Sequence, residues 1–164
     1  MGDTPLGYFH KQWIARSNPL PIVKLLVKAG ANLEVVDKMK RTLLIKAINS
    51  EFPDVAEFLI ELGVDVNATT KNKDKESPLY SATVANNVRL VALLIEKGAD
   101  VNAICGYFKQ TALHVASEYS NRLEIADILI QAGASIDIKD SYGKTALDYA
   151  CSEEMKELLQ GVTP

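Results

Sequence analysis

The side chains best suited to catalysis or metal binding in this sequence belong to two cysteines and two histidines. Cys105 lies in a stretch that we expect to be an exposed loop, where Lys109 is the one nearby cation. Because a reactive thiol needs cationic neighbours that lower its pKa, Cys105 is predicted to be unreactive. Cys151 is expected in the core, and His10 stands apart from any residue with which it could do chemistry. No zinc-ligand spacing and no nucleotide or protease motif is present, so the sequence predicts no enzyme, no metal and no cofactor.

Bulk composition indicates an ordinary soluble globular domain. The chain has 164 residues, of which 48% are hydrophobic and 24% charged, with a net charge of −3. This acidic balance disfavours a dedicated nucleic-acid binder. No apolar run approaches the roughly 18 residues that span a membrane, and no secretory leader is visible. Two isolated cysteines are typical of a reducing compartment, so we expect an intracellular, cytoplasmic protein, with nuclear location or secretion as an effector left open.

An apolar block followed by a glycine recurs along the chain. Ile22 to Val27 precedes Gly30, and Leu90 to Ile95 precedes Gly98. The four glycines are Gly30, Gly63, Gly98 and Gly133, at spacings of 33, 35 and 35 residues. A glycine after an apolar helix is typical of a left-handed C-cap, so each block is predicted to be a helix that ends near its glycine.

A second, shorter element begins with serine or threonine between those blocks. Its starts are Thr42, Ser77, Thr111 and Thr145, at spacings of 35, 34 and 34 residues. The hydroxyl can cap a helix, and a proline such as Pro78 presets the first helical turn. An alanine five residues after each start lets a neighbouring helix approach closely. Each unit is therefore predicted to be a short helix, a turn, a longer helix and a loop, whose apolar surface is buried only when units stack.

These elements resemble the ankyrin repeat, whose signature is Thr-Pro-Leu-His with Ala two positions on. The matching segments are Ser77-Pro78-Leu79, Thr111-Ala112-Leu113-His114, Gly98 to Asn102 and Asp140 to Thr145. The resemblance implies an all-α solenoid of stacked helix-turn-helix units with β-turn or hairpin loops. It implies one domain over residues 1–164, with approximate repeats at 3–36, 37–68, 69–103, 104–137 and 138–161. At His114 it implies a ring that bonds neighbouring backbone and ties repeats together.

The first and last units depart from the repeat pattern. In the first unit Phe9 falls where threonine is expected, and the last unit is short and polar on its outer side from Ser152 to Glu157. Both features are typical of capping repeats, so we expect about five repeats that form a complete array. Two extra residues precede Ser77, around Lys71 to Lys73, and one lies between the helices of the fourth unit, near Glu118 to Asn121. Such insertions map to loops, often on the binding face.

Two asparagines have a second interpretation. Asn67 and Asn102 each follow a leucine eight residues earlier. In some animal ankyrin proteins the matching asparagine resembles a target of asparaginyl hydroxylation. The alternative, which we favour, is a turn-forming asparagine that bonds the backbone.

In the ankyrin family the β-turn tips and the inner faces of the first helices form a concave contact surface. The resemblance assigns to the tips Lys38, Met39 and Arg41 of the second unit, Lys73, Asp74 and Glu76 of the third, Tyr107, Phe108 and Gln110 of the fourth, and Ser141, Tyr142 and Lys144 of the fifth. The inner helix positions include Asn49, Ser50, Val84, Ala85, Glu118 and Tyr119. We predict that partner-binding residues come from these tips and from Glu118 and Tyr119.

Charge is segregated between the tips and the rest of the chain. Residues 37–41 carry a net charge of +2, and residues 71–76, 104–110 and 139–144 carry +1 each, whereas the whole chain carries −3. A basic edge would steer acidic partners in a salt-dependent way. The alternative is that charged tips only keep the loops soluble.

Aromatic residues gather in the fourth and fifth units. Tyr107, Phe108, Tyr119 and Tyr142 are expected to be neighbours across adjacent tips. Exposed Tyr and Phe side chains resemble interface hot spots, where truncation costs about 2 kcal/mol or more of binding free energy. The alternative is that Tyr107 and Phe108 fold back onto their own hairpin as local packing.

The ankyrin resemblance implies a protein-protein interaction module that acts as an adaptor, inhibitor or targeting scaffold. Its partner would be another protein, for which the basic tips suggest an acidic surface, and we expect a monomer without a membrane partner. Two alternatives stay open: a pathogen effector that binds a host protein, and weak nucleic-acid or polyanion binding through the basic tips.

Overall fold

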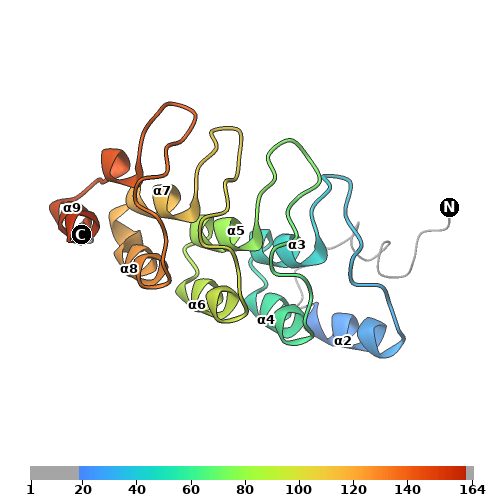
Figure 1. Cartoon of the computed structure of the whole chain (residues 1–164). Helices are drawn as coiled ribbons and strands as arrows, with labels where there is room; N and C mark the ends of the chain where they lie inside the picture. The colour runs from blue at the N-terminus through green and yellow to red at the C-terminus, as the bar shows by residue number, and fades with distance from the viewer. Residues whose placement is uncertain (1–18, 162–164) are drawn as a thin grey trace.

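The computed structural model describes residues 19–161 as a row of paired helices joined by projecting loops (Figure 1). Within this range the regular elements are all helices. The β-type pairing is limited to two isolated antiparallel bridges, Val36 with Thr42 and Cys105 with Gln110. The elements are α2 (Leu20–Lys28), α3 (Leu43–Asn49), α4 (Pro53–Glu61), α5 (Pro78–Val84), α6 (Val88–Glu96), α7 (Ala112–Ser117), η1 (Ser120–Arg122), α8 (Leu123–Gln131), η2 (Ala146–Tyr149) and α9 (Glu153–Gln160). The predicted all-α solenoid of helix-turn-helix units is confirmed.

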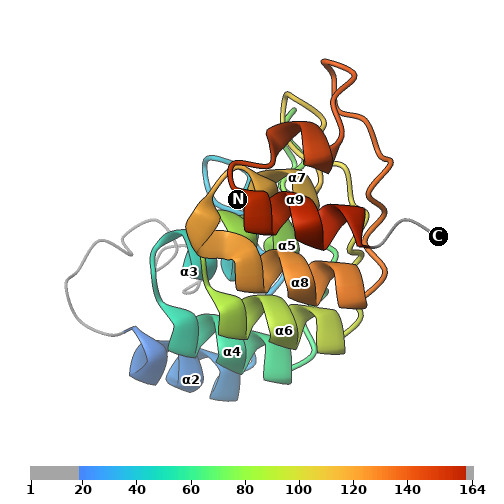
Figure 2. The same ribbon diagram turned by 90° about the vertical axis from the view of Figure 1, so that its left-hand side faces the viewer.

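The helices form two layers. The inner row consists of α3, α5, α7 and η2, each in contact with the next, and the outer row consists of α2, α4, α6, α8 and α9, also in sequential contact. Figure 2 shows the outer row as parallel rods, with the loops projecting from the other side of the stack. No helix within residues 19–161 is long and apolar enough to cross a membrane.

The predicted caps are present at the N-termini and at the C-termini of the helices. Thr42 and Ser77 accept the backbone N–H three residues on, at 3.2 and 3.1 Å, and Thr111 does so at 3.5 Å. After α6, Gly98 has φ +85°, a left-handed conformation that residues with a Cβ adopt at a cost. The equivalent Gly30, Gly63 and Gly133 share it. Each cap satisfies backbone groups that a helix end would otherwise leave unpaired.

Apolar side chains from both rows make one continuous core. Leu59, Leu94 and Leu129 of the outer row are fully buried. Ala82 and Ala116, the small residues predicted to let a neighbouring helix approach closely, are fully buried as well. A larger side chain at these alanine positions would push neighbouring repeats apart, because protein interiors leave few voids.

Asparagine side chains join consecutive repeats beyond the core. Asn67 donates from Nδ2 to the Gly98 carbonyl at 3.0 Å, and its Oδ1 accepts the Asp100 N–H at 2.8 Å. Asn102 makes the same pair of bonds with the next repeat, to the Gly133 carbonyl and from the N–H of Ser135. Both carboxamides therefore bond backbone, as we favoured, although they bond the following repeat rather than their own turn.

The last unit is shorter than the others. Its first helix, η2, is one turn of 3₁₀ helix, and α9 buries Met155 and Leu159 while its acidic residues face solvent. The predicted polar outer side is thus observed. The unusual position of Phe9 in the first unit lies outside the described residues.

Candidate protein-binding surface

Four hairpins project from the inner row of helices within residues 19–161, and we number them second to fifth after the repeat units that they begin. Their bases are closed by backbone bonds from residue 37 to 41, 70 to 76, 105 to 110 and 140 to 144. The third hairpin therefore contains the predicted two-residue insertion, and η1 lies where we placed the insertion between the helices of the fourth unit. The fourth hairpin is also one residue longer than the second, which we did not anticipate because glycine spacing does not show where within a unit a residue is added.

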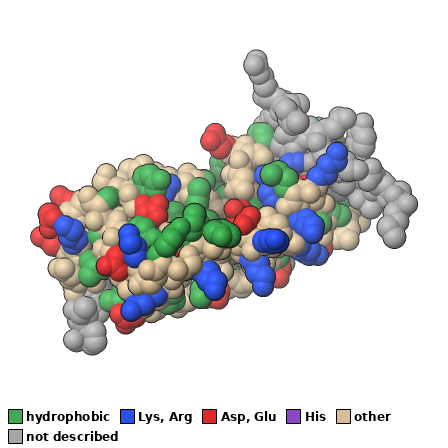
Figure 3. All heavy atoms as spheres, turned by 90° about the horizontal axis from the view of Figure 1, so that it is seen from above, with side chains coloured by type: hydrophobic (Ala, Val, Ile, Leu, Met, Phe, Trp, Pro, Cys, Tyr) green, Lys and Arg blue, Asp and Glu red, His purple; other side chains and the backbone are tan. Residues whose placement is uncertain are grey.

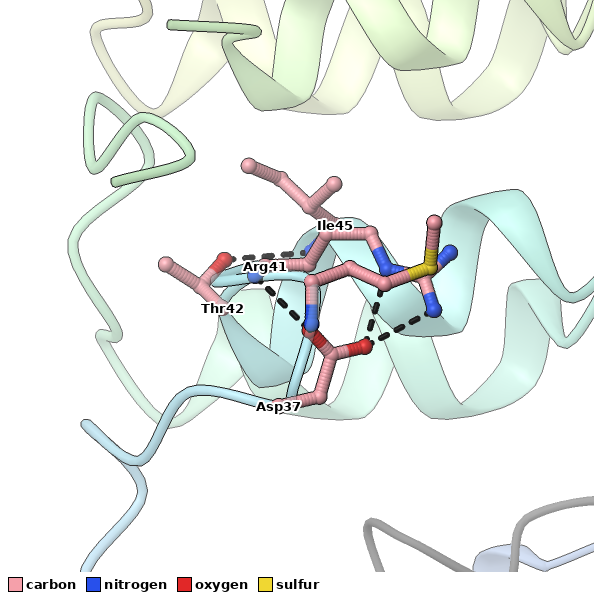
Figure 4. Close-up of polar contacts among 5 residues, drawn as sticks. Asp37, Arg41, Thr42 and Ile45 are labelled. Carbon is pink, nitrogen blue, oxygen red and sulfur yellow. Dashed lines mark hydrogen bonds and ion pairs between the residues drawn. The ribbon is translucent and has the colours of Figure 1, made fainter. Parts of the chain in front are cut away.

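An aspartate organises the first described hairpin. Asp37 accepts the backbone N–H groups of Met39 and Arg41 through Oδ1, both at 2.9 Å. Its Oδ2 lies 2.9 Å from Arg41 Nε and 2.8 Å from an Arg41 terminal nitrogen, a fork that Figure 4 shows. The guanidinium of Arg41 is therefore held at the base of the hairpin, whereas Lys38 and Met39 are exposed at its tip.

Backbone hydrogen bonds tie the tips to one another. Lys71 donates to the Lys40 carbonyl at 2.9 Å, and Ser141 donates to the Phe108 carbonyl at 2.8 Å. Gly106 N–H likewise donates to the Asp74 carbonyl. Because each hairpin is bonded to the next, side chains on different tips keep fixed relative positions, which favours a preorganised contact surface.

Three of the four predicted aromatic neighbours meet at the tips of the fourth and fifth units. The ring centroids of Tyr107 and Phe108 are 5.5 Å apart at an edge-on angle, and those of Phe108 and Tyr142 are 5.5 Å apart and stacked. Tyr107 is 81% exposed, Tyr142 67% and Phe108 44%. We call Tyr107, Phe108 and Tyr142 the aromatic cluster. Its rings pack on one another and still face solvent, and their role as interface hot spots stays a prediction.

The expectation that Tyr119 joins the other three aromatic rings is wrong. Tyr119 follows α7, at the inner position assigned to it, and the Arg122 guanidinium lies 4.1 Å from its ring centroid. Arg122 continues past the ring and donates to the carbonyls of Val84 and Val115 at 2.8 and 3.1 Å, which joins the third and fourth units. Sequence reasoning missed this role because the carbonyls that Arg122 reaches lie up to 38 positions away.

Lysines surround a pocket next to the aromatic cluster. Lys73, Lys75 and Lys109 line a cavity of about 440 Å³ together with Asp74, Ile104, Gly106 and Tyr107. Seen from the tip side, hydrophobic side chains form a band across the middle of the face, and Lys and Arg side chains gather beside it (Figure 3). We call Lys73, Lys75 and Lys109 the lysine pocket. Only Lys73 was predicted; the other two occupy left-handed backbone positions, with φ +47° and +55°.

A second cavity lies between α3 and α5 of the inner row, on the side that the resemblance assigns to the concave surface. It has a volume of about 290 Å³ and is lined by Ile48, Asn49, Glu51, Glu76, Tyr80, Ser81, Val84 and Ala85. Burial, and then repulsion from Asp74, raises the pKa of the Glu76 carboxyl, and Arg41 opposes this shift. Burial raises the pKa of Tyr80 to about 12, with further contributions from Cys105, Glu76 and Glu118. We call this cavity the concave groove.

Asp140 organises the fifth hairpin. Its Oδ1 accepts the N–H groups of Tyr142 and Lys144 at 2.8 and 3.0 Å, and its Oδ2 accepts the Tyr149 hydroxyl at 2.5 Å. Desolvation by itself would raise the pKa of Asp140, but hydrogen bonds from Tyr149, Lys144 and Tyr142 outweigh it and lower that pKa. The hairpin that carries Ser141 and Tyr142 thus depends on an ionised carboxylate.

Acid is therefore expected to weaken the fifth hairpin through Asp140. A lowered folded-state pKa stabilises the protein above the unfolded pKa of about 3.9, and this contribution disappears as the pH falls through the folded value. The Asp140→Asn variant should be less stable than the native chain at pH 6 but should lose less on acidification to pH 2. Urea midpoints measured across that range test this, with the exposed Asp137→Asn as control. Parallel pH curves for native protein and Asp140→Asn would contradict it.

His114 links the fourth unit to the fifth, as the resemblance implied. Its Nδ1 lies 3.2 Å from the Thr111 N–H and 2.8 Å from Thr111 Oγ1, and its Nε2 lies 3.1 Å from the Lys144 carbonyl. Because Nδ1 accepts the backbone N–H, Nε2 carries the proton and donates to Lys144. The ring is 1% exposed and serves the structure of the surface rather than contact with a partner.

Gln110 is buried, although we placed it among the contact residues of the tip. Its amide donates to Glu118 Oε1 at 3.2 Å, at the base of the fourth hairpin. The cause is the position of Gln110 opposite Cys105 in the hairpin pair, which directs its side chain inward. Of the remaining predicted residues, Lys38, Met39, Lys73, Tyr107, Phe108, Tyr119, Ser141, Tyr142 and Lys144 are exposed, and Arg41, Asp74, Glu76 and Glu118 are partly buried.

The two cysteines have the opposite environments to those expected. Cys105 is 1% exposed, with its sulfur 3.4 Å from Ser77 Oγ, because the hairpin base packs on the preceding repeat. Cys151 is exposed, because the backbone leaves the helical conformation at Ala150 to reach α9. Burial raises the pKa of the Cys105 thiol, and hydrogen bonding with Ser77 offsets this only in part.

Thiol reactivity should reflect this exchange of environments. In the native protein, Ellman's reagent is expected to modify Cys151 quickly and Cys105 at least about a hundredfold more slowly, because attack requires an accessible thiolate. A Cys151→Ser variant should then show almost no fast reaction until it is unfolded. A fast reaction of that variant under native conditions would show that Cys105 is accessible.

Comparison with known proteins agrees with this architecture. The family described as ankyrin repeats (3 copies) matches residues 11–105, and that described as ankyrin repeats (many copies) matches residues 94–150. The chain belongs to the ankyrin-repeat family, and the conclusion drawn from its repeated motifs is confirmed.

Several curated proteins are similar over part of this chain. Human protein phosphatase 1 regulatory subunit 27 is 43% identical over 63 residues, which cover 38% of this chain and 41% of that protein. The putative E3 ubiquitin-protein ligase XBAT34 of Arabidopsis thaliana is 41% identical over 76 residues, 46% of this chain and 20% of that protein. A putative ankyrin repeat protein of Acanthamoeba polyphaga mimivirus, L271, is 35% identical over 72 residues, 44% of this chain and 10% of that protein. The chain thus spans less than half the length of each of these relatives. The family, together with a regulatory-subunit relative, supports a protein-interaction module.

Proposed function

We propose that this chain binds a protein partner across its hairpin tips, with the aromatic cluster as the apolar anchor and the lysine pocket engaging an acidic segment. The observation that carries the proposal is the cluster itself. Tyr107, Phe108 and Tyr142 expose their rings side by side on tips that backbone bonds hold together. Contiguous exposed apolar surface bordered by charge is typical of an interaction site.

The lysine pocket indicates that the partner carries an acidic group. Lys73, Lys75 and Lys109 line one cavity that Tyr107 also lines, so an acidic side chain could bind there while an adjoining apolar residue covers the aromatic rings. Charge complementarity of this kind raises the association rate and selects among partners. One relative is named as a phosphatase regulatory subunit, which supports an adaptor, inhibitor or targeting role without a catalytic contribution from this chain.

The test compares three proteins in affinity capture from lysate of the source cells. These are the native chain, the triple variant Tyr107→Ala, Phe108→Ala, Tyr142→Ala, and the control Leu62→Ala, which removes an exposed apolar side chain of the outer layer. Circular dichroism checks the fold of each. Partners retained by native and control proteins but lost from the triple variant would support the proposal. Partners retained by all three would move the site away from the tips.

The lysine pocket also favours a second candidate, binding of nucleic acid or another polyanion. Such binding would be mostly electrostatic and would fall steeply with salt. A Lys73→Ala, Lys75→Ala, Lys109→Ala variant that loses heparin binding at low salt, while native protein keeps it near physiological salt, would favour this candidate. Elution of native protein well below physiological salt would show that its binding to heparin is only non-specific electrostatic attraction.

A further inference from the structure

The concave groove contains a buried polar atom that makes no hydrogen bond to any residue of the 19–161 range. Ser81 is 3% exposed, and its Oγ has no hydrogen-bond partner among the described residues. Thr83 and Ser117, hydroxyl residues buried on α5 and α7, donate to carbonyls four residues earlier at 3.0 and 2.8 Å. The Ser81 hydroxyl could likewise donate to the carbonyl of Ser77, four residues earlier, but it makes no such bond. Because buried polar groups are nearly always satisfied, this hydroxyl indicates a missing external partner.

The rest of the groove indicates what that partner carries. Glu51 and Glu76 both line it, and the side chain of Asn49 adds an amide, while no cation is among the lining residues that the structure describes. Arg41 lowers the pKa of Glu76, but its guanidinium is already held by Asp37. The partly desolvated carboxylate of Glu76 would be stabilised by an incoming positive charge.

The apolar part of the groove suits a long side chain with a charged end. Ile48, Val84 and Ala85 form walls that can cover methylene groups, and the Tyr80 ring offers a flat aromatic surface. Arginine combines such a stem with a planar guanidinium that stacks on aromatic rings and binds carboxylates through two parallel bonds. Lysine provides a compact point charge that neither stacks on an aromatic ring as a plane nor binds a carboxylate through two parallel bonds.

We propose that the concave groove receives the side chain of one arginine of the protein partner, with Glu76, Glu51 and Ser81 Oγ as acceptors. This inference rests on the proposed function that the chain binds a protein partner across its hairpin tips. The third hairpin contributes Glu76 to the groove and Lys73 and Lys75 to the lysine pocket. A partner segment that carries an arginine near an acidic residue therefore matches both cavities. The arginine would bind in the concave groove, and the acidic residue would bind in the lysine pocket.

The experiment follows NMR shifts of the native 164-residue chain during titration with two blocked pentapeptides, Gly-Ala-Arg-Ala-Gly and the same peptide with citrulline in place of arginine. Citrulline keeps the shape of arginine and lacks its charge. We expect saturable shifts at Ile48, Val84 and Ala85 for the arginine peptide, and binding at least about fivefold weaker for the citrulline peptide, since charged hydrogen bonds are the stronger kind.

Variants separate the groove from general surface charge. Glu76→Gln should weaken the arginine peptide at least about fivefold, and Ser81→Ala about threefold. Ser81→Ala should also unfold at the same or a higher temperature than native protein, because it removes an unsatisfied hydroxyl. Glu154→Gln, an acidic position in the cavity between α8 and α9, is the matched control and should change nothing.

Three results would overturn the proposal. They are equal affinity for the arginine and citrulline peptides, shifts centred on α8 and α9 instead of the groove, and the lack of saturable shifts up to the solubility limit of the peptide. The aromatic triple variant, assayed by capture, tests the proposed function separately. Loss of partners there together with any of these three results would keep the tip interface and remove the arginine site.

Discussion

Phe108→Ala is expected to weaken partner binding about 30-fold or more, which corresponds to about 2 kcal/mol of binding free energy. Phe108 is the middle ring of the aromatic cluster: it meets Tyr107 edge-on and stacks on Tyr142. Its removal takes away its own contact area and the support that fixes the other two rings. Isothermal titration with the captured partner measures the effect.

The control for this prediction is Leu62→Ala. Leu62 is 42% exposed and Phe108 44%, so both variants remove a similarly exposed apolar side chain, but Leu62 lies at the end of α4 in the outer layer. Unchanged affinity is expected for Leu62→Ala. A double-mutant cycle of Phe108→Ala with Tyr142→Ala should show coupling between the two stacked rings. Unchanged affinity of folded Phe108→Ala would mean that the cluster is packing of the hairpins and not a contact site.

The fold could be predicted because its determinants are local and repeat in register. A hydroxyl such as that of Thr42 caps the helix that it begins, and a glycine such as Gly98 ends the preceding helix through its own backbone freedom. Neither effect depends on distant contacts. Repetition four times then reveals the stack, since each pair of helices can bury its apolar face only against the next pair.

The parts of the surface that were mispredicted depend on single-residue shifts between repeats. Cys105 and Gln110 are buried because they oppose each other at the base of a hairpin that is one residue longer than expected. Cys151 is exposed because η2 ends at Tyr149 and the backbone leaves the helical conformation at Ala150. Tyr119 lies outside the aromatic cluster because η1 directs it toward Arg122. A repeat pattern shows which unit a residue belongs to. It does not show whether an insertion turns the side chain of that residue toward the core or toward solvent.

Ser81 could have been noticed by comparing units at one position. The residues equivalent to Ser81 are Lys46 in the second unit, Val115 in the fourth and Tyr149 in the fifth. Lys46 and Val115 are also buried, so this register faces inward in three successive units. A short polar side chain at an inward register is a sequence sign of a cavity with a polar floor. Its missing hydrogen-bond partner, however, could be learned only from the structure.

His114→Ala is expected to lower the free energy of unfolding by about 3 kcal/mol, the largest stability effect that we predict for a single substitution. The change leaves a cavity at a fully packed position and removes the acceptor of the Thr111 N–H and the donor to the Lys144 carbonyl. Urea unfolding measures the loss. His114→Gln, which can keep one of these bonds and most of the volume, should cost clearly less.

The location of the damage distinguishes a link between repeats from general loss of packing. The His114–Lys144 bond joins α7 to the fifth hairpin, and η2 packs on α7. Amide hydrogen exchange in η2 and α9 should therefore accelerate more in His114→Ala than exchange in α3 and α4, because stack stability depends on interfaces between neighbours. Uniform acceleration along the chain would show that the array unfolds as one unit. In that case His114 would contribute to the global stability of the core, and the aromatic cluster, whose Tyr142 depends on the fifth hairpin, would not be selectively loosened.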